Sequence, residues 1–297
     1  AMWYGKGPGV DRCGDVFKHA NAAGTSRFGG VLALAADDHA CRSSTLPHGS
    51  EDEFVSAMMP VLNPAGVQDI LDLGLVGWAM SRYTGRWIGF KTIAETVESS
   101  ASVEVDPFAR RIVLPEDFEL PPGGLNIRWP DPPLEQEMRL HRYAVAAAQA
   151  FARANRIDRV VMDSPRARLG IVTTGKSYLD VLQALEYLGL DEAACRDIGI
   201  RVYKVGMTWP LEPEGIAAFA RGLDDIVVVE EKRAFIERQM KEQFYNWPEA
   251  WGRRPSIVGK YDEQGEWILP STGELTPATI AGVIGRRIQR FFTTESI

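Results

Sequence analysis

The stretch Leu169-Gly170-Ile171-Val172-Thr173-Thr174-Gly175-Lys176-Ser177 opens a repeated alternation of strand and helix that decides the fold. Residues 169–173 are apolar and partly β-branched, as in a buried strand, and residues 177–188 have the length and composition of a helix. The alternation continues as strand, helix, strand and helix over 200–205, 214–221, 226–229 and 234–244. Because strands that alternate with helices form parallel sheets, this region predicts a parallel α/β domain.

Residues 170–177 also satisfy G-x-x-x-x-G-K-[ST], the phosphate-binding loop of nucleotide hydrolases. The strand 226–229 with Glu230 and Glu231 after it resembles the acidic strand end that holds magnesium in those proteins. In a true phosphate-binding loop an apolar strand precedes the first glycine, whereas here the β-branched residues lie between the glycines and residues 163–168 are polar. We therefore predict a strand-to-helix turn in which Gly175 permits the bend and Ser177 caps the helix. A P-loop nucleotide hydrolase is kept as an alternative.

The rest of the chain divides into a second α/β region, a connector and a tail. Residues 15–23 and 64–83 predict helices, and the apolar runs 31–36 and 87–90 predict strands. The proline-rich stretch 99–133 has the hydrophobic periodicity of neither a helix nor a strand and predicts a connector. An alanine-rich helix over 134–156 follows it. In the tail, 256–261 is apolar and 277–291 predicts a helix with Thr276 as its N-cap. The expected domains are 1–98 and 134–297.

The N-terminal segment Gly5-Lys6-Gly7-Pro8-Gly9 has the composition of a turn between a strand and a helix. Only four residues precede it, which favours a chain that begins inside a domain. The alternative is that Met2-Trp3-Tyr4 is the end of a strand whose neighbours lie in a longer parent chain.

Composition excludes several classes of protein. The chain has 297 residues, 45% of them hydrophobic, and a net charge of −7, which argues against a nucleic-acid partner. Its three cysteines, Cys13, Cys41 and Cys195, form no C-x-x-C pair, so neither a disulfide scaffold nor a zinc or iron–sulfur site is predicted. No apolar run reaches the roughly 20 residues of a membrane span, and no leader is visible. We expect a cytoplasmic protein without a membrane partner.

Two stretches resemble the thiamine-diphosphate-dependent 2-oxoacid:ferredoxin oxidoreductases, most closely their indolepyruvate ferredoxin oxidoreductase type. The first is MWYGKGPGVDR at 2–12, with FKHAN at 17–21, LAADD at 34–38 and Ser43-Ser44. The second is TWPLEPE at 208–214 with VVVEE at 227–231. The resemblance implies an α/β fold with two parallel-sheet domains, namely a partial pyrimidine-binding domain over 1–98 and a transketolase C-terminal-type domain over 134–297.

The first stretch carries the predicted cofactor site. Glycines at 7 and 9 lack the Cβ that would keep a flat heteroaromatic ring away from the backbone, and Pro8 stiffens the turn. A turn that only reverses the chain is the alternative. With the resemblance, the predicted cofactor-binding residues are Lys6, Gly7, Pro8, Gly9 and Val10.

The predicted substrate-binding residues are Asp38, Ser43 and Ser44. They follow a buried strand, at the end where open parallel sheets bind ligands. Two solvated carboxylates at Asp37 and Asp38 that cap the next loop are the alternative. His39 and His48 lack a third ligand at a characteristic spacing, so no metal site is predicted, and no catalytic residue is predicted in this chain.

The resemblance implies a parent enzyme that decarboxylates an arylpyruvate on thiamine diphosphate with magnesium, transfers the acyl group to coenzyme A and passes two electrons through iron–sulfur clusters to ferredoxin. The family's activating glutamate, magnesium motif and cysteine clusters are not found in this chain. We therefore expect the isolated chain to be inactive and its cofactor site to be shared with the remaining domains or subunits of a homodimeric parent. A non-catalytic assembly module of such a complex is the alternative.

Overall fold

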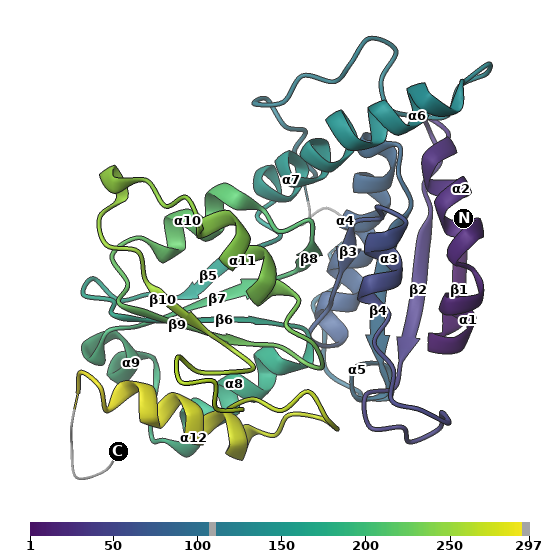
Figure 1. Cartoon of the computed structure of the whole chain (residues 1–297). Helices are drawn as coiled ribbons and strands as arrows, with labels where there is room; N and C mark the ends of the chain where they lie inside the picture. The colour runs from purple at the N-terminus through teal and green to yellow at the C-terminus, as the bar shows by residue number, and fades with distance from the viewer. Residues whose placement is uncertain (107–110, 293–297) are drawn as a thin grey trace. The chain divides into compact units, whose positions relative to one another are not determined.

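The computed structural model describes residues 1–106 and 111–292, which divide into two compact units (Figure 1). The first unit comprises Ala1–Ile157 and Gly206–Glu212, and the second comprises Asp158–Val205 and Pro213–Ile297. The chain therefore passes between the units three times. The boundary at 157/158 differs from the expected boundary at 133/134, because the helix predicted over 134–156 packs its Phe151 into the core of the first unit.

The first unit contains a five-stranded sheet. Its order is β1 (Met2–Lys6), β2 (Leu32–Asp37), β4 (Ile88–Ile93), β3 (Val61–Leu62) and β8 (Met207–Trp209). Neighbouring strands are parallel except for the pair β3 and β8, which is antiparallel. The sequence predicts the two central strands, whereas β3 and β8 are only two and three residues long and carry no period of their own.

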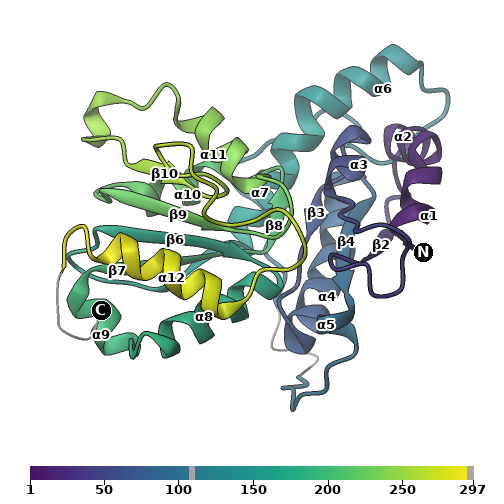
Figure 2. The same cartoon turned by 60° about the horizontal axis from the view of Figure 1, so that its bottom comes forward.

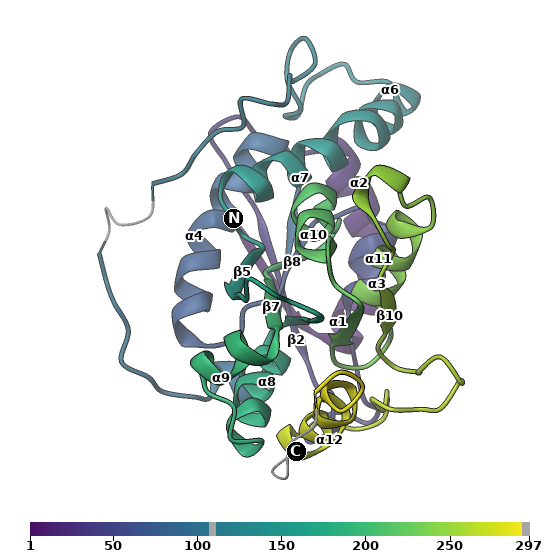
Figure 3. The same ribbon diagram turned by 90° about the vertical axis from the view of Figure 1, so that its left-hand side faces the viewer.

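Helices cover both faces of this sheet. Helix α4 (Val67–Thr84) and α7 (Val145–Ala154) pack against Leu32, Ile88 and Phe90 on one face. Helices α1 (Gly7–Arg12), α2 (Gly14–Ala23) and α3 (Glu51–Ser56) pack against Ala33 and Ala35 on the other. Helix α5 (Ala94–Val97) follows β4, and α6 (Pro133–Arg139) continues through a π-helical turn (Leu140–Ala144) into α7 as one long rod (Figure 3).

The second unit contains another five-stranded sheet. Its order is β10 (Ser256–Val258), β9 (Asp225–Val229), β6 (Leu169–Thr174), β7 (Ile200–Val205) and β5 (Arg159–Met162). Four strands are parallel, three of which the sequence predicts as strands, and the edge strand β5 is antiparallel to β7. The α/β fold class with two largely parallel sheets is therefore confirmed, with one antiparallel edge strand added to each.

Helices also cover both faces of the second sheet (Figure 2). Helix α8 (Lys176–Tyr187) and α12 (Pro277–Ile288) lie side by side on one face, with α9 (Glu192–Ile198) next to them. Helix α10 (Pro213–Ala220) and α11 (Ile236–Phe244) lie on the other, where Phe219 packs on Tyr203. A short 3-10 helix (Glu249–Trp251) follows α11. As predicted, the Thr276 side chain caps α12 by accepting a hydrogen bond from the Thr279 amide.

The stretch that matches the phosphate-binding pattern is a strand followed directly by a helix. Residues 169–174 are all buried in β6, and Gly175, with φ of 54°, makes the bend into α8. Lys176 donates to Asp180 at 2.6 Å and lies 3.6 Å from Glu231, so its ammonium is held by carboxylates of the chain. The expected cap at Ser177 is wrong, because Gly175 occupies the N-cap position of α8 and Ser177 lies two residues further on, buried inside the helix.

The glycine-rich segment near the N-terminus is only partly a turn. Gly5 and Lys6 end the strand β1, and Gly7-Pro8-Gly9 form the first turn of α1 without an intervening loop. Residues 2–4 thus belong to a strand, as the alternative expectation held, but the strand that they pair with is β2 of this chain, whereas the expected neighbour lay in a longer parent chain. None of the helices in the described parts of the chain is long and apolar enough to cross a membrane.

Candidate functional site

The candidate site lies where the parallel strands β1 and β2 end. Lys6 is the last residue of β1 and pairs with Ala36, and Asp37 ends β2, so their side chains and that of Asp38 come to the same edge of the sheet. The carboxyl edge of an open parallel sheet is the usual place for a ligand. The register between the two strands therefore brings together the predicted residues Lys6 and Asp38.

Asp38 organises the loop that follows β2. Its Oδ1 accepts the Arg42 amide at 2.8 Å and its Oδ2 accepts the Ser43 amide at 2.9 Å. Lys6 Nζ donates to Ser43 Oγ at 2.7 Å and lies 3.6 Å from Asp38 Oδ2. The Ser43 amide above all, and then the Arg42 amide, hold the pKa of Asp38 well below its ordinary value. Asp38 is thus a fixed anion, and Lys6, Asp38 and Ser43 form one polar group.

Ser44 takes a different position from its neighbour. Ser43 is exposed, whereas Ser44 is half-buried and its carbonyl accepts a hydrogen bond from Cys41 Sγ at 2.6 Å. Arg42 pairs with Glu95 of α5 at 2.7 Å, which fastens the loop to the end of β4. In this loop Ser43 is therefore exposed to solvent, whereas Ser44 helps to hold the shape of the loop.

A buried charged layer supports this edge of the sheet. Asp37 accepts hydrogen bonds from Ser50 Oγ at 2.5 Å and from the Ser50 amide at 2.9 Å, and Lys91 Nζ lies 3.5 Å from its Oδ2. Lys91 is almost fully buried and also pairs with Glu51. The sequence analysis missed Lys91, although a lysine directly after the apolar run 87–90 is a signal of a buried charge. A buried ammonium needs carboxylates beside it, so this lysine indicates a buried ion pair.

His48 covers the first glycine of the predicted ring contact. Its Nε2 lies 2.9 Å from Asp11 Oδ2, its Nδ1 lies 4.0 Å from Asp37 Oδ1, and its amide donates to the Asp38 carbonyl at 2.9 Å. A Cβ placed on Gly7 would lie 2.2 Å from the imidazole. Glycine at position 7 is therefore required by the chain's own His48, which occupies the space in which a ligand ring was expected to lie.

The other predicted cofactor-binding residues differ in access. A Cβ on Gly9 would meet nothing within 4 Å, so open space borders Gly9. Pro8 is half-buried, and the Val10 side chain is completely buried with Phe17 in the core beneath α1. Of the five predicted residues, only Lys6, Pro8 and Gly9 have a side chain or a backbone surface that a ligand could reach. Val10 can contribute to a ligand site through its backbone alone.

These residues do not make a complete pocket for thiamine diphosphate with magnesium. Among residues 1–106 and 111–292, no group of three or more His, Cys, Asp or Glu side chains is arranged to hold a metal ion. The imidazole of His48 covers Gly7, and the nearby cation Lys6 is held by Ser43 and Asp38. The described residues can form one polar wall of such a site and not the whole of it.

The fold is similar to that of two solved proteins. Its structure is similar to that of the 2-oxoglutarate:ferredoxin oxidoreductase from Magnetococcus marinus, with a TM-score of 0.58 and 15% identity over 97% of this chain and 53% of that chain. It is also similar to a split-gene transketolase in an inactive tetramer, with a TM-score of 0.50 and 14% identity over 97% of this chain and 76% of that chain. The chain thus has the fold shared by 2-oxoacid:ferredoxin oxidoreductases and transketolases.

Comparison of sequences narrows the class. Residues 159–297 match the family described as the indolepyruvate oxidoreductase domain. The chain is 26% identical to indolepyruvate oxidoreductase subunit IorA of Pyrococcus abyssi over 81% of this chain and 36% of that protein. It is 27% identical to the subunit of the same name from Methanothermobacter marburgensis over 86% of this chain and 39% of that protein.

These matches confirm the resemblance noted from the sequence. The chain is a relative of the indolepyruvate oxidoreductase type of 2-oxoacid:ferredoxin oxidoreductase. It spans less than two fifths of the length of these two curated relatives.

Proposed function

We propose that this chain is part of an enzyme that oxidatively decarboxylates indolepyruvate or a related 2-oxoacid. The overall reaction consumes the 2-oxoacid and coenzyme A, releases carbon dioxide and acyl-CoA, and transfers two electrons through iron–sulfur clusters to ferredoxin. Thiamine diphosphate, when bound, supplies the carbanion that this decarboxylation requires. The observation that supports the proposal most is the match of residues 159–297 to the indolepyruvate oxidoreductase domain.

In this proposal the first unit is part of a pyrimidine-binding domain and the second is a domain of transketolase C-terminal type. Lys6, Pro8 and Gly9 would border the cofactor, and Asp38 with Ser43 would offer a fixed anion and a hydroxyl to the substrate side. The remaining walls and the metal ligands would come from other domains or subunits. The names of the two relatives, which call each a subunit, support such partners. We further propose a homodimeric assembly in the cytoplasm.

The test is a substrate panel on the longer protein that contains this chain. Indolepyruvate, phenylpyruvate, pyruvate and 2-oxoglutarate would each be supplied with coenzyme A, thiamine diphosphate, magnesium and a viologen acceptor. We expect reduction of the viologen with an arylpyruvate, and a loss of rate in Asp38→Asn relative to Asp52→Asn, which lies outside the candidate site on α3. If none of the four 2-oxoacids supported reduction of the viologen, the proposed reaction would be contradicted.

A non-catalytic assembly module is a second candidate, favoured by the placement of His48 over Gly7. In that case the loop after β2 would serve only to hold α1 to the sheet. The two candidates differ in the behaviour of the assembled complex. A complex that keeps its full rate after Asp38→Asn and loses its subunits after Gly7→Ala would favour the assembly module.

A further inference from the structure

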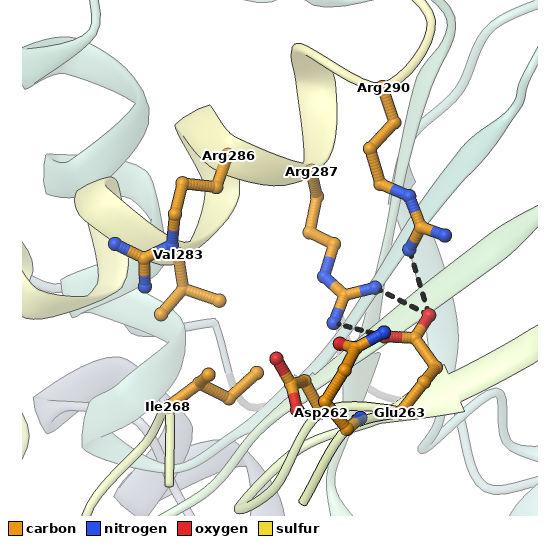
Figure 4. Close-up of a pocket in the computed structure, with 8 residues that line it drawn as sticks. Asp262, Glu263, Ile268, Val283, Arg286, Arg287 and Arg290 are labelled. Atoms are coloured by element: carbon orange, nitrogen blue, oxygen red, sulfur yellow. Dashed lines mark hydrogen bonds and ion pairs between the residues drawn. The ribbon is translucent and has the colours of Figure 1, made fainter. Parts of the chain in front are cut away.

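A cavity of about 270 Å³ lies in the second unit, between the end of α12 and the segment that follows β10 (Figure 4). This segment is a small hairpin closed by an antiparallel bridge between Tyr261 and Trp267. The cavity is at the amino edge of the second sheet, where β9 begins at Asp225, and it plays no part in the candidate site of the first unit.

Two arginines and two carboxylates next to the cavity neutralise one another. Arg287 donates to Glu263 through Nη1 at 2.8 Å and Nη2 at 2.9 Å, and its Nη1 lies 3.1 Å from Asp225 Oδ2. Arg290 donates to the same two carboxylates, at 2.8 Å to Glu263 and 3.2 Å to Asp225. The hydrogen bonds from Arg287 above all lower the pKa of Glu263 well below its ordinary value. This closed network fastens α12 to β9 and to the hairpin.

Two further charged side chains line the cavity outside that network (Figure 4). Arg286 is exposed and makes no hydrogen bond or ion pair with the part of the chain that the structure describes. Asp262 Oδ1 accepts the amides of Gln264 and Glu266, both at 2.9 Å, while its Oδ2 has no donor among the described residues. Ile268, which is half-buried, and Val283, which is almost fully buried, also line the cavity. The cavity thus offers one cationic group, one anionic group and a small apolar surface at Ile268.

We propose that this cavity binds a small zwitterion of the α-amino acid class. Its carboxylate would pair with Arg286, its ammonium with Asp262, and its side chain would lie beside Ile268. The charges favour a zwitterion over a plain anion, because phosphate at Arg286 would also face the carboxylates of Asp262 and Glu263. The volume is just below the range of about 300–1,000 Å³ typical of small-molecule sites, which suits an amino acid better than a nucleotide.

The proposal can be tested by calorimetry on the complete 297-residue chain. L-phenylalanine and L-leucine are the probes, 3-phenylpropionate lacks the ammonium, phenethylamine lacks the carboxylate, and inorganic phosphate tests for an anion site. We expect the amino acids to bind and each truncated analogue to bind at least about tenfold more weakly, since a hydrogen bond to a charged group is lost. Equal binding of phenylpropionate and phenylalanine, or preferential binding of phosphate, would show an anion site and overturn the proposal.

Three variants locate the binding. Arg286→Ala removes an exposed side chain and Asp262→Asn keeps the oxygen that accepts the two amides, so both leave the fold intact. Arg253→Ala is the control, because Arg253 is an exposed arginine of the same unit, also without an ion pair among the described residues. We expect at least about tenfold weaker binding of phenylalanine in the first two and no change in the third. Unchanged binding in Arg286→Ala, or no binding to the unmodified chain at about 10 mM amino acid, would refute the site.

Discussion

Gly7→Ala is a perturbation whose cost follows directly from the position of His48. The added Cβ would lie 2.2 Å from the imidazole, and the ring is held by Asp11 at 2.9 Å and by its own amide, which donates to the Asp38 carbonyl. Overpacking of this kind costs about 1–3 kcal/mol, whereas glycine to alanine in a helix gains at most about 1 kcal/mol. We expect the free energy of unfolding to fall by about 1–2 kcal/mol.

Gly9→Ala is the matched control, two residues further along the same helix. A Cβ at Gly9 meets nothing within 4 Å, so only the helix propensity changes, and stability should stay equal or rise by up to about 1 kcal/mol. Urea unfolding of both variants measures the difference as a shift of midpoint. A double variant with His48→Ala isolates the cause, because without the imidazole Gly7→Ala should cost almost nothing.

Two results would refute this reasoning. One is a Gly7→Ala protein as stable as Gly9→Ala, which would show that the loop after β2 yields without cost. The other is an equal cost of Gly7→Ala with and without His48, which would place the strain elsewhere in α1.

Three further predictions concern Lys176, Glu230 and the cofactor. Lys176→Ala should leave a fluorescent ATP analogue unbound, as in the unmodified chain, because β6 fills the place of a phosphate loop; saturable magnesium-dependent binding lost in the variant would contradict this. Burial raises the pKa of Glu230 to about 7, so the folded state keeps a proton that the unfolded state loses, and stability should fall from about pH 4.5 to pH 7 by up to about 3 kcal/mol. Urea unfolding at several pH values checks this, and an equally steep fall in Glu230→Gln would assign it to another group. Calorimetry should show weak or no binding of thiamine diphosphate to this chain. In the longer protein, Gly9→Val should weaken the binding of thiamine diphosphate about tenfold by filling the open space beside Gly9. Low-micromolar binding to the chain alone would disprove the incomplete site.

The sequence predicts the long elements of both units and not the short ones. β2, β4, β6, β7 and β9 are mostly buried strands of five or six residues that are rich in apolar side chains, and α4, α8 and α12 have a helical period, so local pattern is enough to find them. β3, β5 and β8 have two to four residues and exist because a neighbouring strand is available to pair with them. Such pairing is a long-range property that no local period records.

The same distinction applies to the candidate site. Asp38 and Ser43 were predicted because polar residues after a buried strand indicate a ligand edge, and the structure brings them together with Lys6. The positions of His48 over Gly7 and of Lys91 beside Asp37 depend on contacts between residues about 40 or more apart in the sequence. Whether Gly7 faces a ligand or a side chain of its own chain could not be read from a glycine-proline-glycine pattern.

The three crossings between the units determine how this protein can be cut. The last residue of β7 is Val205, and the chain then leaves for the other unit to add β8 before it returns at Pro213. A shortened protein that starts at Asp158 would carry Met207 and Leu211, which are completely buried in the whole chain, without the strand that pairs with theirs. The stretch that matches the indolepyruvate oxidoreductase domain therefore begins where the second unit begins, but it also contains residues 206–212, which belong to the first unit. A chimera of two relatives joined at a single point near residue 157 would therefore pair β3 of one relative with β8 of the other.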